Sequence, residues 1–206
     1  LKVLSTKNWK VVPSKTFGAY QELAQTSSDG PNINLSGRYT VDELNEIASK
    51  VGKTPIHFNG NKELHLGGTN LGYTYELSFD IKPKNNNKTN AILFQSTYGN
   101  ITLNTEGSGK LGFSRDGYTY TFNFIPKNNS WQTLRLVGDY KSVTLYVDGK
   151  EKERLAAYKK TERLPNGFNF QQTLSFPLEK IGDSKNGFSG DMRNLKLTYI
   201  NPQNAK

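Results

Sequence analysis

The stretch "SWQTLRLVGDYKSVTLYVDGKE", residues 130–151, decides the fold class. Leu134 and Leu136 alternate with polar residues, and Leu145 and Val147 do so in the segment that follows. Alternation with a period of two predicts half-buried β-strands. Asp148-Gly149 then supplies the two residues that a tight hairpin turn favours, because both of its central positions need positive φ. The stretch therefore predicts consecutive antiparallel strands.

The same pattern recurs on both sides of this stretch. "IHFNGNKELHL" (56–66) and "KLGFSRDGYTYTFNF" (110–124) carry the hairpin signals Asn59-Gly60 and Asp116-Gly117, and "YTYELSFDIKP" (73–83) alternates strictly. Many short strands with glycine-rich turns predict an all-β, two-sheet antiparallel β-sandwich. The side chains that we expect between the sheets are Leu77, Phe79, Ile81, Leu134, Leu136, Leu145, Val147, Leu195 and Leu197.

One helix is expected, at about residues 41–51. Thr40 and Glu43 form a capping box ahead of apolar positions that share one helical face, and Gly52 ends the segment. We expect a single domain over residues 1–206. Residues 1–54 form an N-terminal extension with this helix and a strand near 9–12, and residues 55–200 form the sandwich.

The composition limits the kinds of molecule that the chain is expected to bind. The net charge is +9, but no run of five basic residues occurs, so the lysines are expected on a solvated surface and not in a nucleic-acid interface. No apolar stretch is long enough to span a membrane. The chain has no cysteine and is rich in Asn and Lys, as in "KPKNNNKTN" and "PKNNS", a composition typical of low-GC bacteria.

Three segments resemble the laminin-G-like, concanavalin-A-like jelly-roll modules. They are residues 56–83, the Trp-led stretch 130–151 and the closing segment "IGDSKNGFSGDMRNLKLTY" (181–199), in the same order as in that family. The whole chain is similar to modules attached to large secreted bacterial glycosidases, of the β-N-acetylhexosaminidase or sialidase type. The resemblance implies an extracellular or cell-surface module of a larger protein, with other domains of that protein and a glycan as its partners. An adhesion or architectural domain is the alternative.

Catalytic groups are not expected. Glycosidases need two carboxyl groups at a short separation, whereas Glu76 and Asp80 stand four residues apart on one strand, about 13 Å at a rise of ~3.3 Å per residue. His57 and His65 can approach each other across the Asn59-Gly60 turn, but a zinc site needs three or four ligands, so polar surface histidines are the preferred interpretation. No nucleophile motif is present, and we predict that the chain is not an enzyme.

Sugar recognition calls for aromatic rings beside planar polar groups, with Arg where the sugar carries a carboxylate. The candidate residues are Arg115 and Tyr118 at a hairpin tip, Tyr98 and Asn100 in "STYGN", and an outward row with Gln132 or Arg135 beside Tyr146. For Arg135, an ion pair with Asp80 or Glu76 across the sheet is the structural alternative. Trp131 is expected in the core.

The sequence is compatible with a bound calcium ion but does not require one. A structural calcium is common in sandwiches similar to this one, and Asp148, Asp183 and Asp191 lie where a loop can offer oxygen ligands. No other cofactor is expected. The predicted ligand is a glycan that is acidic or contains N-acetylhexosamine, because the basic surface and Arg115 favour an anionic or amide-bearing partner.

Overall fold

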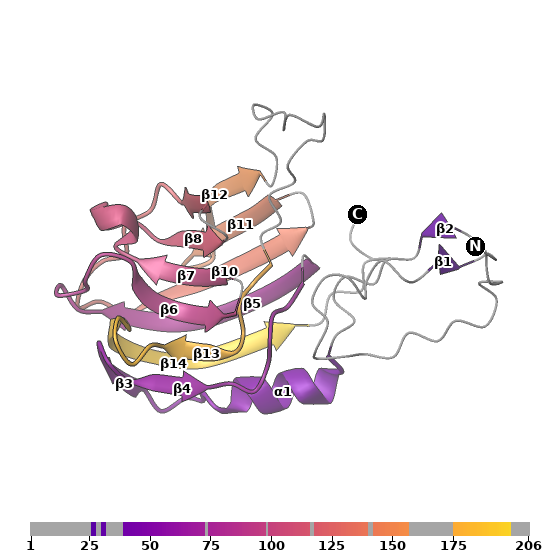
Figure 1. Ribbon diagram of the computed structural model, residues 1–206, viewed down its shortest axis with the longest axis horizontal. Helices are drawn as coiled ribbons and strands as arrows, with labels where there is room; N and C mark the ends of the chain where they lie inside the picture. Colours follow the sequence, from indigo (N-terminus) through magenta and orange to yellow (C-terminus); the bar gives the residue numbers. More distant parts are fainter. Residues whose placement is uncertain are drawn as a thin grey trace.

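The strands form two six-stranded antiparallel sheets that stack face to face (Figure 1). Sheet I has the strand order β12-β11-β10-β5-β14-β3, and sheet II has the order β4-β13-β6-β7-β8-β9. The computed structural model describes residues 26–27, 30–31, 39–72, 74–97, 99–115, 118–139, 142–156 and 175–198. Sheet I is made of β3 (Ile56–Asn59), β5 (Thr74–Pro83), β10 (Gln132–Asp139), β11 (Ser142–Val147), β12 (Lys150–Ala156) and β14 (Ser189–Thr198). Sheet II is made of β4 (Glu63–His65), β6 (Ala91–Ser96), β7 (Gly99–Leu103), β8 (Gly112–Arg115), β9 (Tyr118–Thr121) and β13 (Lys180–Gly182).

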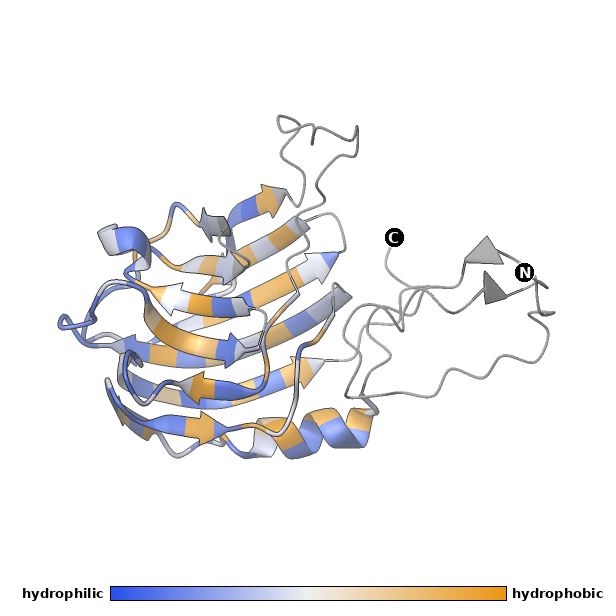
Figure 2. Cartoon of the chain, viewed as in Figure 1, coloured by the Kyte–Doolittle hydropathy of each residue, from blue (hydrophilic) through white to orange (hydrophobic). Residues whose placement is uncertain are grey.

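The core lies between the two sheets, and its residues are those expected from the alternation. Hydrophobic and hydrophilic residues alternate along the strands in Figure 2. All nine residues predicted to point inward are buried, except that Val147 is partly exposed and packs against the core. The register explains the match, since Leu134 lies opposite Phe79 and Leu136 opposite Leu77. The two-sheet antiparallel sandwich predicted from the sequence is confirmed.

An aromatic cluster joins the sheets. Phe79 of sheet I and Phe94 of sheet II meet at 5.1 Å between ring centroids, and Phe176 lies 4.9 Å from Phe94 and 5.8 Å from Tyr75. Phe176 belongs to the segment before β13 and is fully buried. Burial raises the pKa of Tyr75 far above its ordinary value, because its phenolate would be desolvated.

Of the three predicted turn dipeptides, the two that the structure describes differ in what they form. Asp148 and Gly149 have φ of 50° and 82° and join β11 to β12 as predicted. The prediction of a hairpin at Asn59-Gly60 is wrong, because the two flanking strands lie in different sheets. Strand β3 pairs with β14 in sheet I, whereas β4 pairs with β13 in sheet II. Only Gly60 of that dipeptide has positive φ, at 93°, and its N–H donates to the carbonyl of Phe188. The chain therefore crosses between layers here, and this crossing lets both Phe58 and Leu66 enter the core.

The β8–β9 hairpin has the predicted register. Phe113 lies opposite Tyr120, and Ser114 lies opposite Thr119. The turn itself, residues 116–117, lies outside the described residues. Phe113 is buried and Tyr120 is packed against the core, so the apolar pair shares the inner face of sheet II.

Helix α1 (Val41–Ser49) lies beside the sandwich, with the predicted capping box between Thr40 and Glu43. Leu44, Ile47 and Val51 are buried, as their helical spacing predicts. Backbone hydrogen bonds from positions 194 and 195 of β14 to positions 52 and 51 attach the end of the helical segment to sheet I.

Two short strands, β1 (Thr26–Ser27) and β2 (Gly30–Pro31), pair with each other in the N-terminal region. The strand expected near residues 9–12 lies outside the described residues. In the part of the chain that the structure describes, no helix has the length and apolar character needed to cross a membrane.

Candidate functional site

A row of polar residues crosses the outer face of sheet II. The register places one residue of each strand side by side, and the neighbouring inward positions Phe94 and Ile101 are fully buried. Asn100, a predicted ligand contact, is the β7 member of this row, and its Oδ1 is buried without a partner among the described residues. Ligand contact by Asn100 stays a prediction. The row consists of His65, Lys180, Gln95, Asn100, Ser114 and Thr119.

The other predicted contacts of this sheet are placed only in part. Arg115 and Tyr118 are directly opposite each other in the β8–β9 ladder, as the predicted hairpin requires. Their side chains, and the whole of Tyr98, lie outside the described residues. A joint role of these three residues in binding therefore stays a prediction.

Arg135 lies on the outer face of sheet I with Tyr146. Its guanidinium carbon is 3.9 Å from the Tyr146 ring centroid, and Nη1 donates to Glu76 at 3.1 Å. The ion pair with Glu76 is the contact that the structural alternative expected, and ligand contact by Arg135 stays a prediction. Gln132 does not share this face: it is buried, and its Oε1 accepts a hydrogen bond from the backbone of Lys127 at 2.6 Å. The prediction that Gln132 faces outward is wrong. The strand register pairs Gln132 with inward-facing Ile81, so its side chain lies on the inner face of sheet I.

Trp131 is not a core residue, contrary to the sequence prediction. It immediately precedes β10 and is partly exposed, with the guanidinium of Arg193 4.3 Å from its ring centroid. Arg193 also donates to Asp80 at 3.1 Å. The Trp131 ring is thus covered by a cation on the outer side of the sheet and does not enter the sandwich.

The carboxylates of sheet I are engaged by neighbouring side chains. Asp80 accepts hydrogen bonds from Thr133, Arg193 and Asn194 at 2.7–3.1 Å. Burial alone would raise the pKa of Asp80, but these hydrogen bonds and the charge of Arg193 outweigh it and lower the pKa. Glu76 is paired with Arg135, so both acids lie in ion pairs on a polar sheet face, which matches the sequence interpretation.

The two histidines lie in different sheets, so the approach across a hairpin does not occur. Nδ1 of His57 is 2.8 Å from Asp191, and Nε2 of His65 is 3.1 Å from Glu63. Within the described ranges, no three His, Cys, Asp or Glu side chains gather as metal ligands.

The remaining candidate calcium ligands take part in local hydrogen bonds. Oδ1 of Asp183 accepts from the backbone N–H groups of Lys185 and Asn186 at 2.9 Å, and Asp148 accepts from the backbone N–H of Thr133 at 2.8 Å. The backbone bonds to Asp183 are the main reason that its pKa is lowered. A structural calcium stays a prediction.

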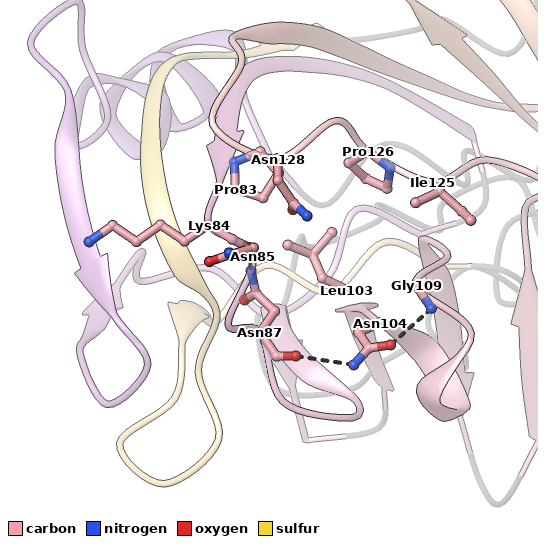
Figure 3. A pocket seen from close by; sticks show the side chains of 10 residues that line it. All are labelled: Pro83, Lys84, Asn85, Asn87, Leu103, Asn104, Gly109, Ile125, Pro126 and Asn128. Atoms are coloured by element: carbon pink, nitrogen blue, oxygen red, sulfur yellow. Dashed lines mark hydrogen bonds between the residues drawn. The ribbon is translucent and has the colours of Figure 1, made fainter.

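The site that the sequence did not predict is a hollow at the end of the sandwich where β5 and β7 finish (Figure 3). Its volume is about 180 Å³, and we call it the asparagine hollow. Two copies of the tetrapeptide Pro-Lys-Asn-Asn, at 83–86 and 126–129, meet here, and the N–H of Asn129 donates to the carbonyl of Pro83 at 2.7 Å. The lining residues are Pro83, Lys84, Asn85, Asn87, Leu103, Asn104, Gly109, Ile125, Pro126 and Asn128.

Two of these asparagines build the hollow. Nδ2 of Asn87 donates to the carbonyls of Lys84 and Ser189, and its Oδ1 accepts from the N–H of Ser189. Asn104 donates to the carbonyl of Asn87 at 3.1 Å and accepts from the N–H of Gly109 at 2.9 Å. Figure 3 shows this chain of amides from Asn87 to Gly109. The walls are therefore fixed by two amide groups whose nitrogen and oxygen both already have backbone partners.

The other two asparagines are free to bind. Asn85 and Asn128 are exposed and make no hydrogen bond within the described part of the chain. Beside them Ile125 is 59% exposed, while Leu103 below is buried. The side chain of Lys84 extends away from the other labelled residues in Figure 3. The hollow thus offers unused amide donors and acceptors next to an apolar surface, and none of its described lining residues carries a carboxylate.

Solved structures are similar to this chain at low sequence identity. A Bacteroides ovatus protein assigned to carbohydrate binding matches with a TM-score of 0.50 and 15% identity, over 73% of this chain and 44% of its own. Domain 4 of the arabinanase AbnA from Geobacillus stearothermophilus, solved with arabinotriose, gives a TM-score of 0.46 and 18% identity, over 73% of this chain and 75% of its own. The CBM40 of the Ruminococcus gnavus IT-sialidase, bound to α2,6-sialyllactose, gives a TM-score of 0.45 and 12% identity, over 72% of this chain and 91% of its own. At these identities the likeness concerns the fold alone.

The sequence of the chain matches a laminin-G-type family model, described as the concanavalin A-like lectin/glucanases superfamily, over residues 58–198. No curated protein matches the chain. The matched range runs from β3 to the end of β14 and so contains both sheets. The match confirms the resemblance seen in the strand motifs. The chain belongs to the concanavalin A-like lectin/glucanase superfamily.

Proposed function

We propose that this chain is a non-catalytic carbohydrate-binding module of a larger secreted bacterial glycosidase, and that the asparagine hollow holds a sugar residue. The observation that carries the proposal is the pairing of two unused amides, Asn85 and Asn128, with the exposed side chain of Ile125. A sugar ring presents an apolar C–H face and a rim of hydroxyls. Planar amides beside an apolar surface match both features, with the amides fixing the orientation of the ring.

The rigidity of the hollow supports the same function. Asn87 and Asn104 hold its walls through five hydrogen bonds to the backbone. A site whose walls are already ordered loses little conformational entropy when a ligand binds. Because each sugar contact replaces a contact with water, the net gain is small, and we expect a dissociation constant of roughly 0.01–1 mM for one site. Other domains of the same protein would raise retention on a glycan surface through multivalency.

The alternative, an adhesion domain that binds a protein, calls for a broad exposed apolar patch. Among the described residues, the large hydrophobic side chains that are exposed are Val41, at 58%, and Ile125, at 59%. Val41 begins helix α1, whereas Ile125 lines the asparagine hollow. A small polar hollow with one apolar residue fits a sugar better than a protein surface.

Absence of catalysis is part of the proposal. The two acids considered as a glycosidase pair, Glu76 and Asp80, are bonded to arginines and side-chain donors of the same sheet. A general acid needs a raised pKa, but the pKa of Asp80 is lowered. We expect no turnover of aryl glycosides by the purified chain. Turnover that disappears in Glu76→Gln or Asp80→Asn would contradict this part.

A glycan array followed by calorimetry on the best hit tests the binding proposal. Asn85→Ala and Asn128→Ala should each weaken binding about 3- to 10-fold, since each removes one or two net hydrogen bonds. Asn45→Ala is the matched control, because Asn45 is an exposed asparagine on helix α1. No glycan hit, or equal affinity in all three variants, would contradict the assignment of the hollow.

A further inference from the structure

A second hollow adjoins the first and differs from it in charge. Its volume is about 300 Å³, at the lower end of the range of small-molecule sites, about 300–1,000 Å³. Two lysines, Lys88 and Lys185, line it together with amides and hydroxyls, and none of its described lining residues is acidic. We call it the lysine hollow. Its lining residues are Asn59, Gly60, Asn61, Asn86, Lys88, Ser184, Lys185, Gly187 and Ser189.

One short segment, "KNNNK" at residues 84–88, separates the two hollows. Asn85 and Asn87 line the asparagine hollow, whereas Asn86 and Lys88 line the lysine hollow. From residue 85 to residue 88, successive residues thus line opposite hollows. A ligand that fills the asparagine hollow therefore needs only to cross this segment to reach the two lysines.

The lysines carry charge that nothing in the described part of the chain neutralises. Lys88 and Lys185 are exposed, and their ammonium groups form no ion pair or hydrogen bond there. The nearest acid in sequence, Asp183, is occupied: it accepts from two backbone N–H groups, and its Oδ2 is 3.3 Å from Lys180. Glu63 is likewise paired with Lys180, at 2.8 Å. The lysine hollow therefore attracts anions.

The three segments that form the lysine hollow are bonded to one another. Gly60 and the 187–188 segment exchange two backbone hydrogen bonds, at 3.0 and 3.1 Å. Nδ2 of Asn186 donates to the carbonyls of Thr89 and Asn90 at 3.1 and 3.0 Å, and Asn87 holds the 84–88 segment to β14. These links fix the backbone on both sides of the hollow, so the two lysine stems start from defined positions.

From these contacts we infer that the ligand is an anionic glycan, with one sugar residue in the asparagine hollow and a carboxylate or sulfate ester on the adjoining residue held between Lys88 and Lys185. The inference rests on the proposed function and adds the chemical class of the ligand. Hydrogen bonds from ammonium groups to an anion are stronger than those between neutral groups. Asn61, Asn86 and Ser184 remain to contact the uncharged hydroxyls.

Three probes with the same neutral core test the inference: N-acetyllactosamine, its 3′-sialylated form and its 6-sulfated form, each titrated into the full chain by calorimetry. At least one charged probe should bind roughly tenfold more tightly than the neutral one. Raising the ionic strength from about 0.01 M to about 0.15 M shortens the screening length from about 30 Å to about 8 Å. This change should remove much of the advantage of the charged probe and leave the neutral probe unaffected.

The decisive variant is Lys88→Gln/Lys185→Gln, which should lose the preference for the charged probe and keep the affinity for the neutral one. Its matched control is Lys150→Gln/Lys152→Gln, which removes two exposed lysines of β12 and should keep the preference. The carboxylate and sulfate probes show which anion fits.

If neither charged probe gains affinity, or if the gain survives loss of Lys88 and Lys185, the inference is wrong. Binding of the neutral probe that still depends on Asn85 and Asn128 would then leave the proposed function standing. If binding of the neutral probe does not depend on Asn85 and Asn128 either, the proposed sugar site in the asparagine hollow is wrong as well.

Discussion

Removing the side chain of Asn87 should destabilise the protein strongly, although the residue lies in a surface loop. Nδ2 of Asn87 donates to the carbonyls of Lys84 and Ser189 at 2.7 and 3.0 Å, and Oδ1 accepts from the N–H of Ser189 at 2.7 Å. A net hydrogen bond contributes about 1 kcal/mol, and an unpaired backbone group costs more. Asn87→Ala should therefore lower the free energy of unfolding by about 2–4 kcal/mol.

The matched control is Asn85→Ala, two residues away in the same loop. Asn85 is exposed and makes no hydrogen bond within the described ranges, so its removal should change the free energy of unfolding by less than about 0.5 kcal/mol. Urea unfolding followed by tryptophan fluorescence measures both variants. Equal stability of the two variants would refute the division between asparagines that build the hollow and asparagines that bind.

Three further predictions concern the sandwich and its loops. Leu134→Ala removes a fully buried side chain between the sheets and should cost about 2–5 kcal/mol in urea unfolding; a loss below about 1 kcal/mol would place Leu134 outside the core. Gly112→Ala should destabilise by about 1–3 kcal/mol, since the added Cβ would lie 2.7 Å from Oγ1 of Thr105; a neutral change would contradict this close approach. Asp183→Asn should lower stability at pH 7. The pKa of Asp183 is lowered in the folded state, so the stabilisation that its carboxylate provides is lost as the pH falls below the ordinary value of 3.8. The difference in the free energy of unfolding between the variant and the wild type should therefore close at low pH. A difference that is constant from pH 7 to pH 3 would contradict the role of the charge.

The strands could be predicted because burial on one face imposes a period of two on the sequence. Leu77, Phe79, Leu134 and Leu136 all obey this period, and Asp148-Gly149 forms the turn that its two positive φ angles favour. Asn59-Gly60 shows the limit of such local signals. A dipeptide that suits a tight turn also suits a crossing between layers, and only pairing with distant β14 and β13 decides between them.

The candidate site was less accessible to sequence reasoning because distant segments build it. The two Pro-Lys-Asn-Asn tetrapeptides are separated by more than forty positions, and each alone resembles ordinary loop composition. Their repetition was the available signal. Which asparagine is structural, such as Asn87, and which is free, such as Asn85, depends on the partners that the fold brings to each amide.

The most direct test of the proposed site is a nuclear magnetic resonance titration of the ¹⁵N- and methyl-labelled chain with the best ligand from the glycan array. We predict that the side-chain amide signals of Asn85 and Asn128 and the methyl signals of Ile125 shift together and saturate with one dissociation constant. The signals of Tyr146, on the outer face of sheet I, should stay in place. Shifts confined to the Arg135–Tyr146 face, with the signals of the asparagine hollow unchanged, would contradict the proposed sugar site.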